Sequence, residues 1–102
     1  MKYNEEETLA EVLEFIKSTY SGHYAGDDEI QLVDAWKALG IAEETIQGNI
    51  LGYIWRYGKK QGFNKKDLLK SIHLLTILIH LNESKETNTD VDLGSSVKVL
   101  LT

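Results

Sequence analysis

The sequence contains no cysteine and no proline, and it has only three histidines. Without cysteine there can be no disulfide, no thiolate nucleophile and no cysteine-ligated zinc site, which suits a reducing cytoplasm. Without proline nothing in the chain forces a helix to break. Three scattered histidines are too few to predict a metal site, so no metal ligand is assigned.

Long apolar runs are also missing. The longest apolar stretch, Ile72 to Leu81, is about half the length that a membrane-spanning helix needs. The first seven residues are polar and acidic, which does not match a secretory signal. We therefore expect a cytoplasmic protein of 102 residues without a membrane partner, folded as one domain.

Apolar residues recur with helical spacing along most of the chain, which predicts an all-α fold of four helices. The expected helices are Glu5 to Tyr20, Asp27 or Asp28 to Leu39, Glu44 to Tyr57, and a last helix from the cap Asn64 to Leu81. Asn4 with Glu7 and Asn64 with Asp67 have the spacing of capping boxes, and Gly40 is an expected helix stop. Residues 1–81 would form the helical domain, and residues 82–102 a polar linker with a loose C-terminal tail.

The helical faces predict which side chains are buried. The first helix places Leu9, Val12, Leu13, Ile16 and Tyr20 on one face; the third places Ile46, Ile50, Tyr53, Ile54 and Tyr57 on its core side. The last helix has two apolar stripes, Leu68-Ile72-Leu75-Ile79 and Leu74-Ile77-Leu81. Two stripes in a small domain indicate burial on both sides, and Leu51 and Trp55 add further apolar surface. We therefore expect the helices to assemble a homo-oligomer.

Two glycines, Gly48 and Gly52, share a face of the third helix with Asn49 and Arg56. Each glycine costs about 1 kcal/mol relative to alanine inside a helix, so a close neighbour is expected on that face. The neighbour is either another helix or a ligand that contacts the bare backbone, and the sequence leaves both open.

A cluster of basic residues follows these glycines in an otherwise acidic chain. Six of the 11 Lys and Arg residues lie between positions 56 and 70 with one acidic residue, so this stretch carries +5 and the remainder −10. Such a cluster predicts a local anionic ligand, and the start of the last helix adds free N–H groups that suit phosphate. The predicted nucleotide or phosphate site comprises His23, Tyr24, Asn49, Tyr53, Arg56, Lys59, Lys60, Lys65, Lys66 and Lys70. It is not a P-loop, because the G-x-x-x-x-G-K-[ST] pattern is absent.

Several short motifs occur in an order that resembles a small domain family of tailed phages. They are His23-Tyr24, Val33-Asp34, Gly48-Asn49, Tyr53, Arg56, Gly58-Lys59-Lys60 and Asp67-Leu68 with Lys70. The family-like region covers about residues 23–80. The family's function is poorly known, but it includes a nucleoside-monophosphate kinase that lacks a P-loop, forms a large oligomer and phosphorylates deoxynucleotides. Gly52 and Leu74 stand where that family has a lysine and an aromatic residue.

The resemblance implies a small helical oligomer that recognises nucleotide phosphates in the cytoplasm of an infected host. We expect nucleotide binding without turnover, for instance the capture of a host or defence-signalling nucleotide. One alternative is a kinase that needs ATP and Mg²⁺, with Asp34 or Asp67 as the catalytic carboxylate. A second alternative is a protein-interaction inhibitor of a host factor that uses the acidic first helix. Sequence-specific DNA binding is not expected, because the net charge is −5 and no reader-helix pattern is present.

Overall fold

The computed structural model describes residues 1–21, 28–59 and 62–92. In these residues the chain forms four α-helices, namely α1 (Glu5–Thr19), α2 (Asp28–Leu39), α3 (Ala42–Arg56) and α4 (Lys65–Asp92). No strand occurs among them; a single antiparallel bridge between Lys59 and Gly62 closes the turn before α4. The predicted all-α class is confirmed, and the predicted helices lie within two residues of the predicted positions except at the end of the last helix.

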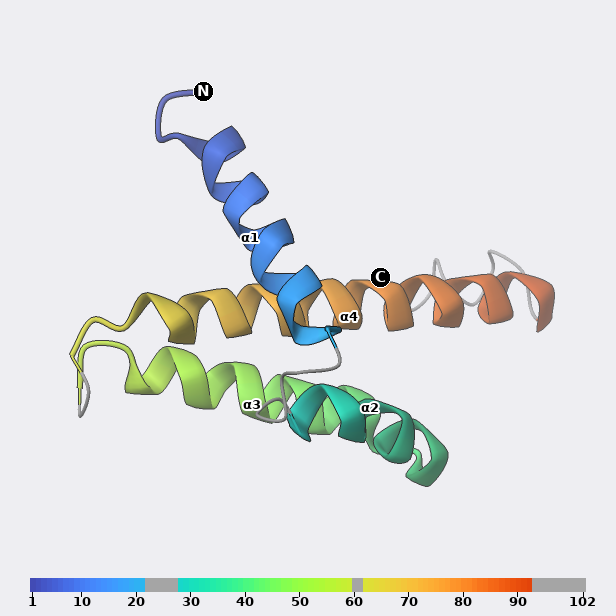
Figure 1. Cartoon of the computed structure of the whole chain (residues 1–102). Helices are drawn as coiled ribbons and strands as arrows, with labels where there is room; N and C mark the ends of the chain where they lie inside the picture. Colours follow the sequence, from blue (N-terminus) through green and yellow to red (C-terminus); the bar gives the residue numbers. More distant parts are fainter. Residues whose placement is uncertain (22–27, 60–61, 93–102) are drawn as a thin grey trace.

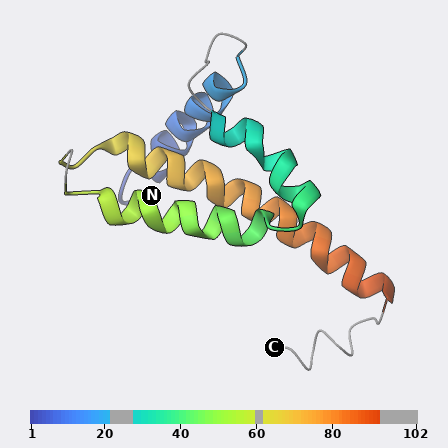
Figure 2. The ribbon, with the colours of Figure 1, turned by 90° about the horizontal axis from the view of Figure 1, so that it is seen from below.

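An antiparallel pair of helices, α3 and α4, forms the centre of the molecule (Figure 1). Helix α2 packs against α3, and α1 contacts α4 and projects away from the other helices. The view from below shows that the last part of α4 continues beyond the start of α3 (Figure 2). Three helices therefore share one core, and α1 is attached to it through α4.

The core is small and lies between α2, α3 and α4. Ile46, Tyr53 and Leu74 form its buried centre, and half-buried Ile30 and Trp36 of α2 pack against them. Ile77, Leu78 and Leu81 add the contribution of α4. The core thus uses the second predicted stripe of α4. The other stripe is only partly covered, because Leu75 and Ile79 are exposed.

Helix α1 buries less of its apolar face than the sequence predicted. Val12 is its one buried residue, while Leu9 and Leu13 are 61% and 51% exposed. Tyr20, just after the helix, is also exposed. The physical reason is the position of α1, which contacts α4 and projects away from the other helices, so that α4 covers only part of its apolar face (Figure 1). On α3 the same correction applies to Ile54 and Tyr57, which were expected in the core and are exposed.

Helix α4 ends at Asp92, eleven residues after the expected end at Leu81. Residues 82–92 were predicted as a linker because they have no apolar periodicity, yet they are helical. Extending an existing helix avoids the unfavourable nucleation step, so a polar segment can continue it without a packed face. Lys85 also ties this part of α4 to the start of α3, with its Nζ 3.3 Å from Glu43 Oε2.

The helix ends show where the capping predictions apply. Asn64 does cap α4, because its Oδ1 accepts a hydrogen bond of 2.9 Å from the backbone N–H of Lys66. Gly40 follows α2 with φ +76°, as expected for a helix stop. Asn4 makes no side-chain cap of α1; it has φ 59°, and Glu5 Oε1 accepts the N–H of Tyr3 instead. The carboxylate of Asp67 makes no capping-box bond among the described residues.

Two glycines of the α3 region are expected to respond to alanine in opposite directions. Gly58 has φ +82°, and a Cβ there would lie 2.8 Å from Phe63 Cε1, so Gly58→Ala should destabilise the fold by about 1–3 kcal/mol. A Cβ at Gly48 meets nothing within 4 Å, so Gly48→Ala should stabilise it by about 1 kcal/mol. Urea unfolding of both variants measures the difference, and equal effects of the same sign would contradict it.

Candidate functional site

The clearest grouping of predicted site residues surrounds the ring of Tyr53 on α3. The guanidinium carbon of Arg56 lies 4.6 Å from the ring centroid, and Nζ of Lys70, from α4, lies 5.4 Å from it. The Tyr53 hydroxyl donates a hydrogen bond of 2.8 Å to Glu29 Oε1 at the start of α2. Three helices therefore meet at one side chain. Tyr53, Arg56 and Lys70 are called the Tyr53 cluster below.

The Tyr53 cluster holds two positive charges close together. By the two ring distances, the cationic groups of Arg56 and Lys70 are at most about 10 Å apart. Neither forms an ion pair with a described carboxylate, whereas Lys17, Lys65 and Lys85 each do. Like charges at this separation repel, and an anion placed between them would remove that repulsion. The arrangement suits a phosphate chain, since a guanidinium offers paired donors and an ammonium a point charge.

Gly52 lies beside this cluster and explains part of the glycine pattern. Nη1 of Arg56 is 3.8 Å from the position that a Cβ of Gly52 would occupy, so the guanidinium folds back along the bare helix. At Gly48 no atom of the described chain comes close. Of the two explanations that the sequence left open, a neighbouring helix is not found among the described residues of the chain. A ligand or a second molecule stays a prediction for this face.

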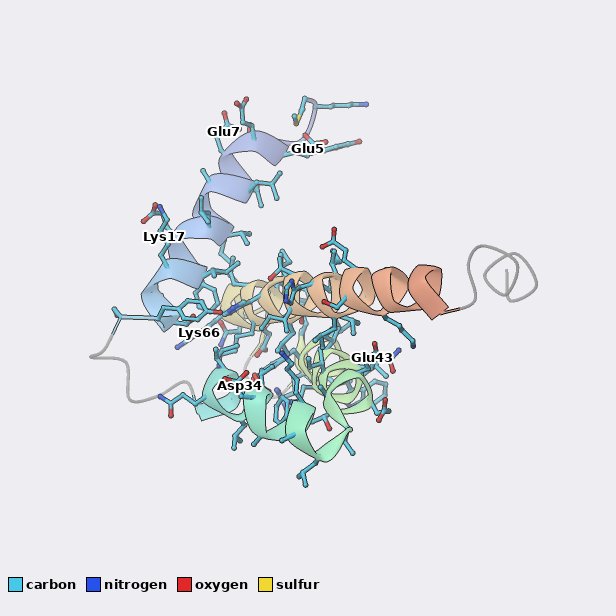
Figure 3. The ribbon with its side chains drawn as sticks, turned by 90° about the vertical axis from the view of Figure 1, so that its right-hand side faces the viewer. Glu5, Glu7, Lys17, Asp34, Glu43 and Lys66 are labelled. Carbon is cyan, nitrogen blue, oxygen red and sulfur yellow. The ribbon has the colours of Figure 1, made fainter. Side chains whose placement is uncertain are left out.

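The other predicted basic residues are divided among different surroundings. Nζ of Lys59 lies 4.1 Å from the centroid of the Trp55 ring, on another side of α3 from Tyr53. Nζ of Lys65 is 2.8 Å from Glu11 Oε2 and so links α4 to α1. Lys66 has no ion pair among the described residues and extends from the start of α4 (Figure 3). The predicted single basic surface is therefore several separate environments, of which the Tyr53 cluster is the most concentrated.

The remaining predicted site residues lie outside the Tyr53 cluster or outside the described residues. Asn49 is half-buried and lies two turns before Arg56 on the same side of α3. His23, Tyr24 and Lys60 fall outside the described residues. Asp67 lies in the first turn of α4, where its backbone carbonyl accepts the Ser71 hydroxyl. Asp34 lies on α2 and lines a cavity with His73 and His80, and Asp67 is not among the lining residues.

Two partners of the site could not have been found from the sequence. Glu29 orients Tyr53 from 24 residues away, and Glu11 engages Lys65 from 54 residues away. Neither spacing carries a local signal, because the contacts depend on how the helices pack. His73 is buried, with its ring against Phe15 and Tyr20, whereas His80 is exposed.

Comparison with known families places this arrangement in context. A family model described as a protein of unknown function, DUF3310, matches residues 18–75, which is more than half of the chain. The chain belongs to the DUF3310 family. The DUF3310 match spans α2, α3 and the first part of α4, so it includes the whole Tyr53 cluster. It overlaps the predicted family-like region 23–80 and leaves most of α1 and the end of α4 outside.

No curated protein and no solved structure matches this DUF3310 chain significantly. In the described parts of the chain, no helix has both the length and the apolar character needed to cross a membrane. The same parts contain no group of three or more histidine or carboxylate side chains arranged to hold a metal ion.

Proposed function

We propose that this protein binds a nucleotide through its phosphate groups, and that the Tyr53 cluster is the phosphate site. The observation that carries the proposal is the convergence of Arg56 and Lys70 on one ring without a carboxylate partner among the described residues. A chain with a net charge of −5 has ample carboxylates to neutralise these cations. Two cations held close together without one are the arrangement expected of an anion site.

The resemblance to a phage domain family suggests the biological setting. In that setting the protein would act in the host cytoplasm and capture a host or defence-signalling nucleotide. The alternative within the same resemblance is phosphoryl transfer to a deoxynucleoside monophosphate. That reaction depends mainly on positioning and on charge stabilisation, and a metal bridges the phosphates. Its carboxylate would be Asp34 or Asp67.

One experiment tests binding and distinguishes it from turnover. The purified chain is incubated with a nucleotide panel, with and without ATP and Mg²⁺, then washed and heat-denatured, and the released compounds are identified by mass spectrometry. A nucleotide that is retained and released unchanged supports binding. A monophosphate returned as a diphosphate supports the kinase, and Asp34→Asn should then stop turnover. No retention of any nucleotide would contradict the proposal.

We also propose that the protein self-associates through the apolar side chains that its small core leaves uncovered. Among the described residues, large apolar side chains are exposed more often than they are buried. On α3, Leu51 and Trp55 are each 70% exposed; on α4, Leu75 and Ile79 are exposed one turn apart. A monomer seldom leaves this much apolar surface in contact with water, and a second copy of the chain offers a matching surface.

Self-association predicts a specific effect of polar substitutions on α4. The parent chain should be an oligomer at micromolar concentration, and Leu75→Gln with Ile79→Gln should convert it to a monomer, because the covered apolar area is lost. Size-exclusion chromatography with light scattering measures the mass. Gln31→Ala, at an exposed polar position of α2, is the control and should leave the mass unchanged. A monomeric parent would refute self-association.

A further inference from the structure

A second feature of the molecule is a cavity between the end of α1, helix α2 and helix α4. Its volume is about 470 Å³, which is within the usual range for small-molecule sites. Ile30 and Val33 of α2 and Ile77 and Leu81 of α4 give it apolar walls. Polar groups lie among them, contributed by Tyr20, Asp34, Lys37, His73, Thr76 and His80. The walls therefore combine apolar side chains with polar groups in about equal number, and a site for an organic ligand uses both, the apolar walls for contact and the polar groups for orientation.

The cavity adjoins the Tyr53 cluster along one face of α4. Lys66, Lys70, His73 and Ile77 follow at spacings of four, three and four residues, so their side chains project from the same side of the helix. From Lys70 to Ile77 the helix rises about 10 Å, and His73 lies between them. A molecule lying along this face would contact the cavity at one end and Lys70 at the other.

Helix α2 joins the two sites as well. Glu29 accepts the hydrogen bond of Tyr53, and the next residue, Ile30, both lines the cavity and packs on the core cluster that contains Tyr53. In Figure 3, Asp34 of α2 and Lys66 of α4 lie on the same side of the molecule. The cavity and the cationic cluster are therefore neighbours that share a wall.

We infer that this cavity receives the base of the nucleotide whose phosphates lie at the Tyr53 cluster, an inference that rests on the proposed function. A flat heteroaromatic ring fits between the aliphatic side chains of α2 and α4. The rings of Tyr20 and His73, with centroids 6.0 Å apart, give aromatic surface at the α1 end. The carboxylate of Asp34 and the imidazole of His80 can bond to the polar edge of the base. The distance of about 10 Å along α4 between Lys70 and Ile77 is one that a single nucleotide can span from its phosphates to its base.

The test compares ligands that differ only by the nucleoside. Isothermal titration of the parent chain uses ATP, GTP, CTP and UTP, each against inorganic tripolyphosphate. Thr76 lines the cavity and lies outside the buried core, so Thr76→Phe should fill the cavity. We expect Thr76→Phe to weaken binding of the preferred nucleotide at least tenfold and to leave tripolyphosphate binding unchanged. Asn82→Phe, exposed on α4 and away from the cavity, is the matched control and should change neither.

The possible results distinguish failure of the cavity assignment from failure of the proposed phosphate site. If Thr76→Phe binds the nucleotide like the parent while Arg56→Gln and Lys70→Gln weaken it, the cavity assignment is overturned and the phosphate site stands. If the parent binds tripolyphosphate but none of the four nucleotides, the cavity assignment is also overturned. If the parent binds neither kind of probe, both proposals fail.

A measurement on the parent chain avoids any question about folding of the variant. The chain has three histidines, so their imidazole signals can be assigned in NMR spectra with a His80→Gln variant. Both His73 and His80 line the cavity. A base bound there should shift the signals of these two residues, and tripolyphosphate should not. Equal shifts with both probes, or none with either, would overturn the inference.

Discussion

Replacing Arg56 and Lys70 together with glutamine is expected to weaken nucleotide binding by at least about 100-fold. Hydrogen bonds to charged groups contribute about 1.5–3 kcal/mol each, and 1.4 kcal/mol corresponds to a factor of ten in affinity. Both cations lie on the Tyr53 ring, so each can reach an anion placed beside it. Glutamine keeps the helix propensity and most of the side-chain length. The change should therefore affect binding more than folding, and isothermal titration measures it directly.

Other basic residues of the same chain provide the controls. Lys85→Gln removes one positive charge that is paired with Glu43 and lies at the other end of α3, so it should change affinity by less than about threefold. Lys65→Gln removes a charge that lies on α4, as Lys70 does, but is already paired with Glu11. If the glutamine substitutions at Arg56, Lys70, Lys85 and Lys65 all weaken binding equally, affinity depends on the total charge of the protein. In that case the Tyr53 cluster is not a site.

A salt titration adds an independent check on the parent. Exposed charges interact over about 10 Å at 0.1 M ionic strength and less at higher salt. Binding through Arg56 and Lys70 should therefore weaken as salt rises, and the double glutamine variant should lose most of this dependence. Base contacts in the cavity should contribute little to it.

The helices could be predicted because their signals are local. Apolar spacing, the cap Asn64 and the stop Gly40 each lie within a few residues of the feature that they determine. The end of α4 could not be predicted in the same way. Residues 82–92 lack an apolar face, and they are helical because a helix already precedes them. A pattern that depends on apolar periodicity does not detect a helical extension that lacks this periodicity.

The candidate site could also be predicted only in part from local sequence signals. Its charges and its aromatic residue were visible in the sequence, and Tyr53, Arg56 and Lys70 do meet. The sequence could not separate them from Lys59 and Lys65, because Trp55 and Glu11 engage those lysines only after the helices pack. The cavity was not predicted, since Ile16 and Ile77 were each assigned to packing faces. It arises from the angle at which α1 and α2 meet α4.

The second large effect is expected in the core rather than in the site. Ile46 is fully buried and contacts side chains from α2 and α4 through the cluster with Tyr53 and Leu74. Ile46→Ala should lower the free energy of unfolding by about 2–5 kcal/mol, the range for isoleucine truncation in a packed interior. A domain of this size has about 5–15 kcal/mol in total, so one substitution removes a large share of its stability.

The control for this prediction lies on the same helix. Ile54 is 50% exposed, so Ile54→Ala removes the same atoms from a half-solvated position and should cost less than about 1.5 kcal/mol. Urea denaturation followed by circular dichroism compares the two variants, in the presence and absence of tripolyphosphate. If both variants lost the same free energy of unfolding, the Ile54 side chain would have to be buried to the same extent as Ile46. Because Ile54 is exposed in the single chain, such a result would place it in the contact between copies.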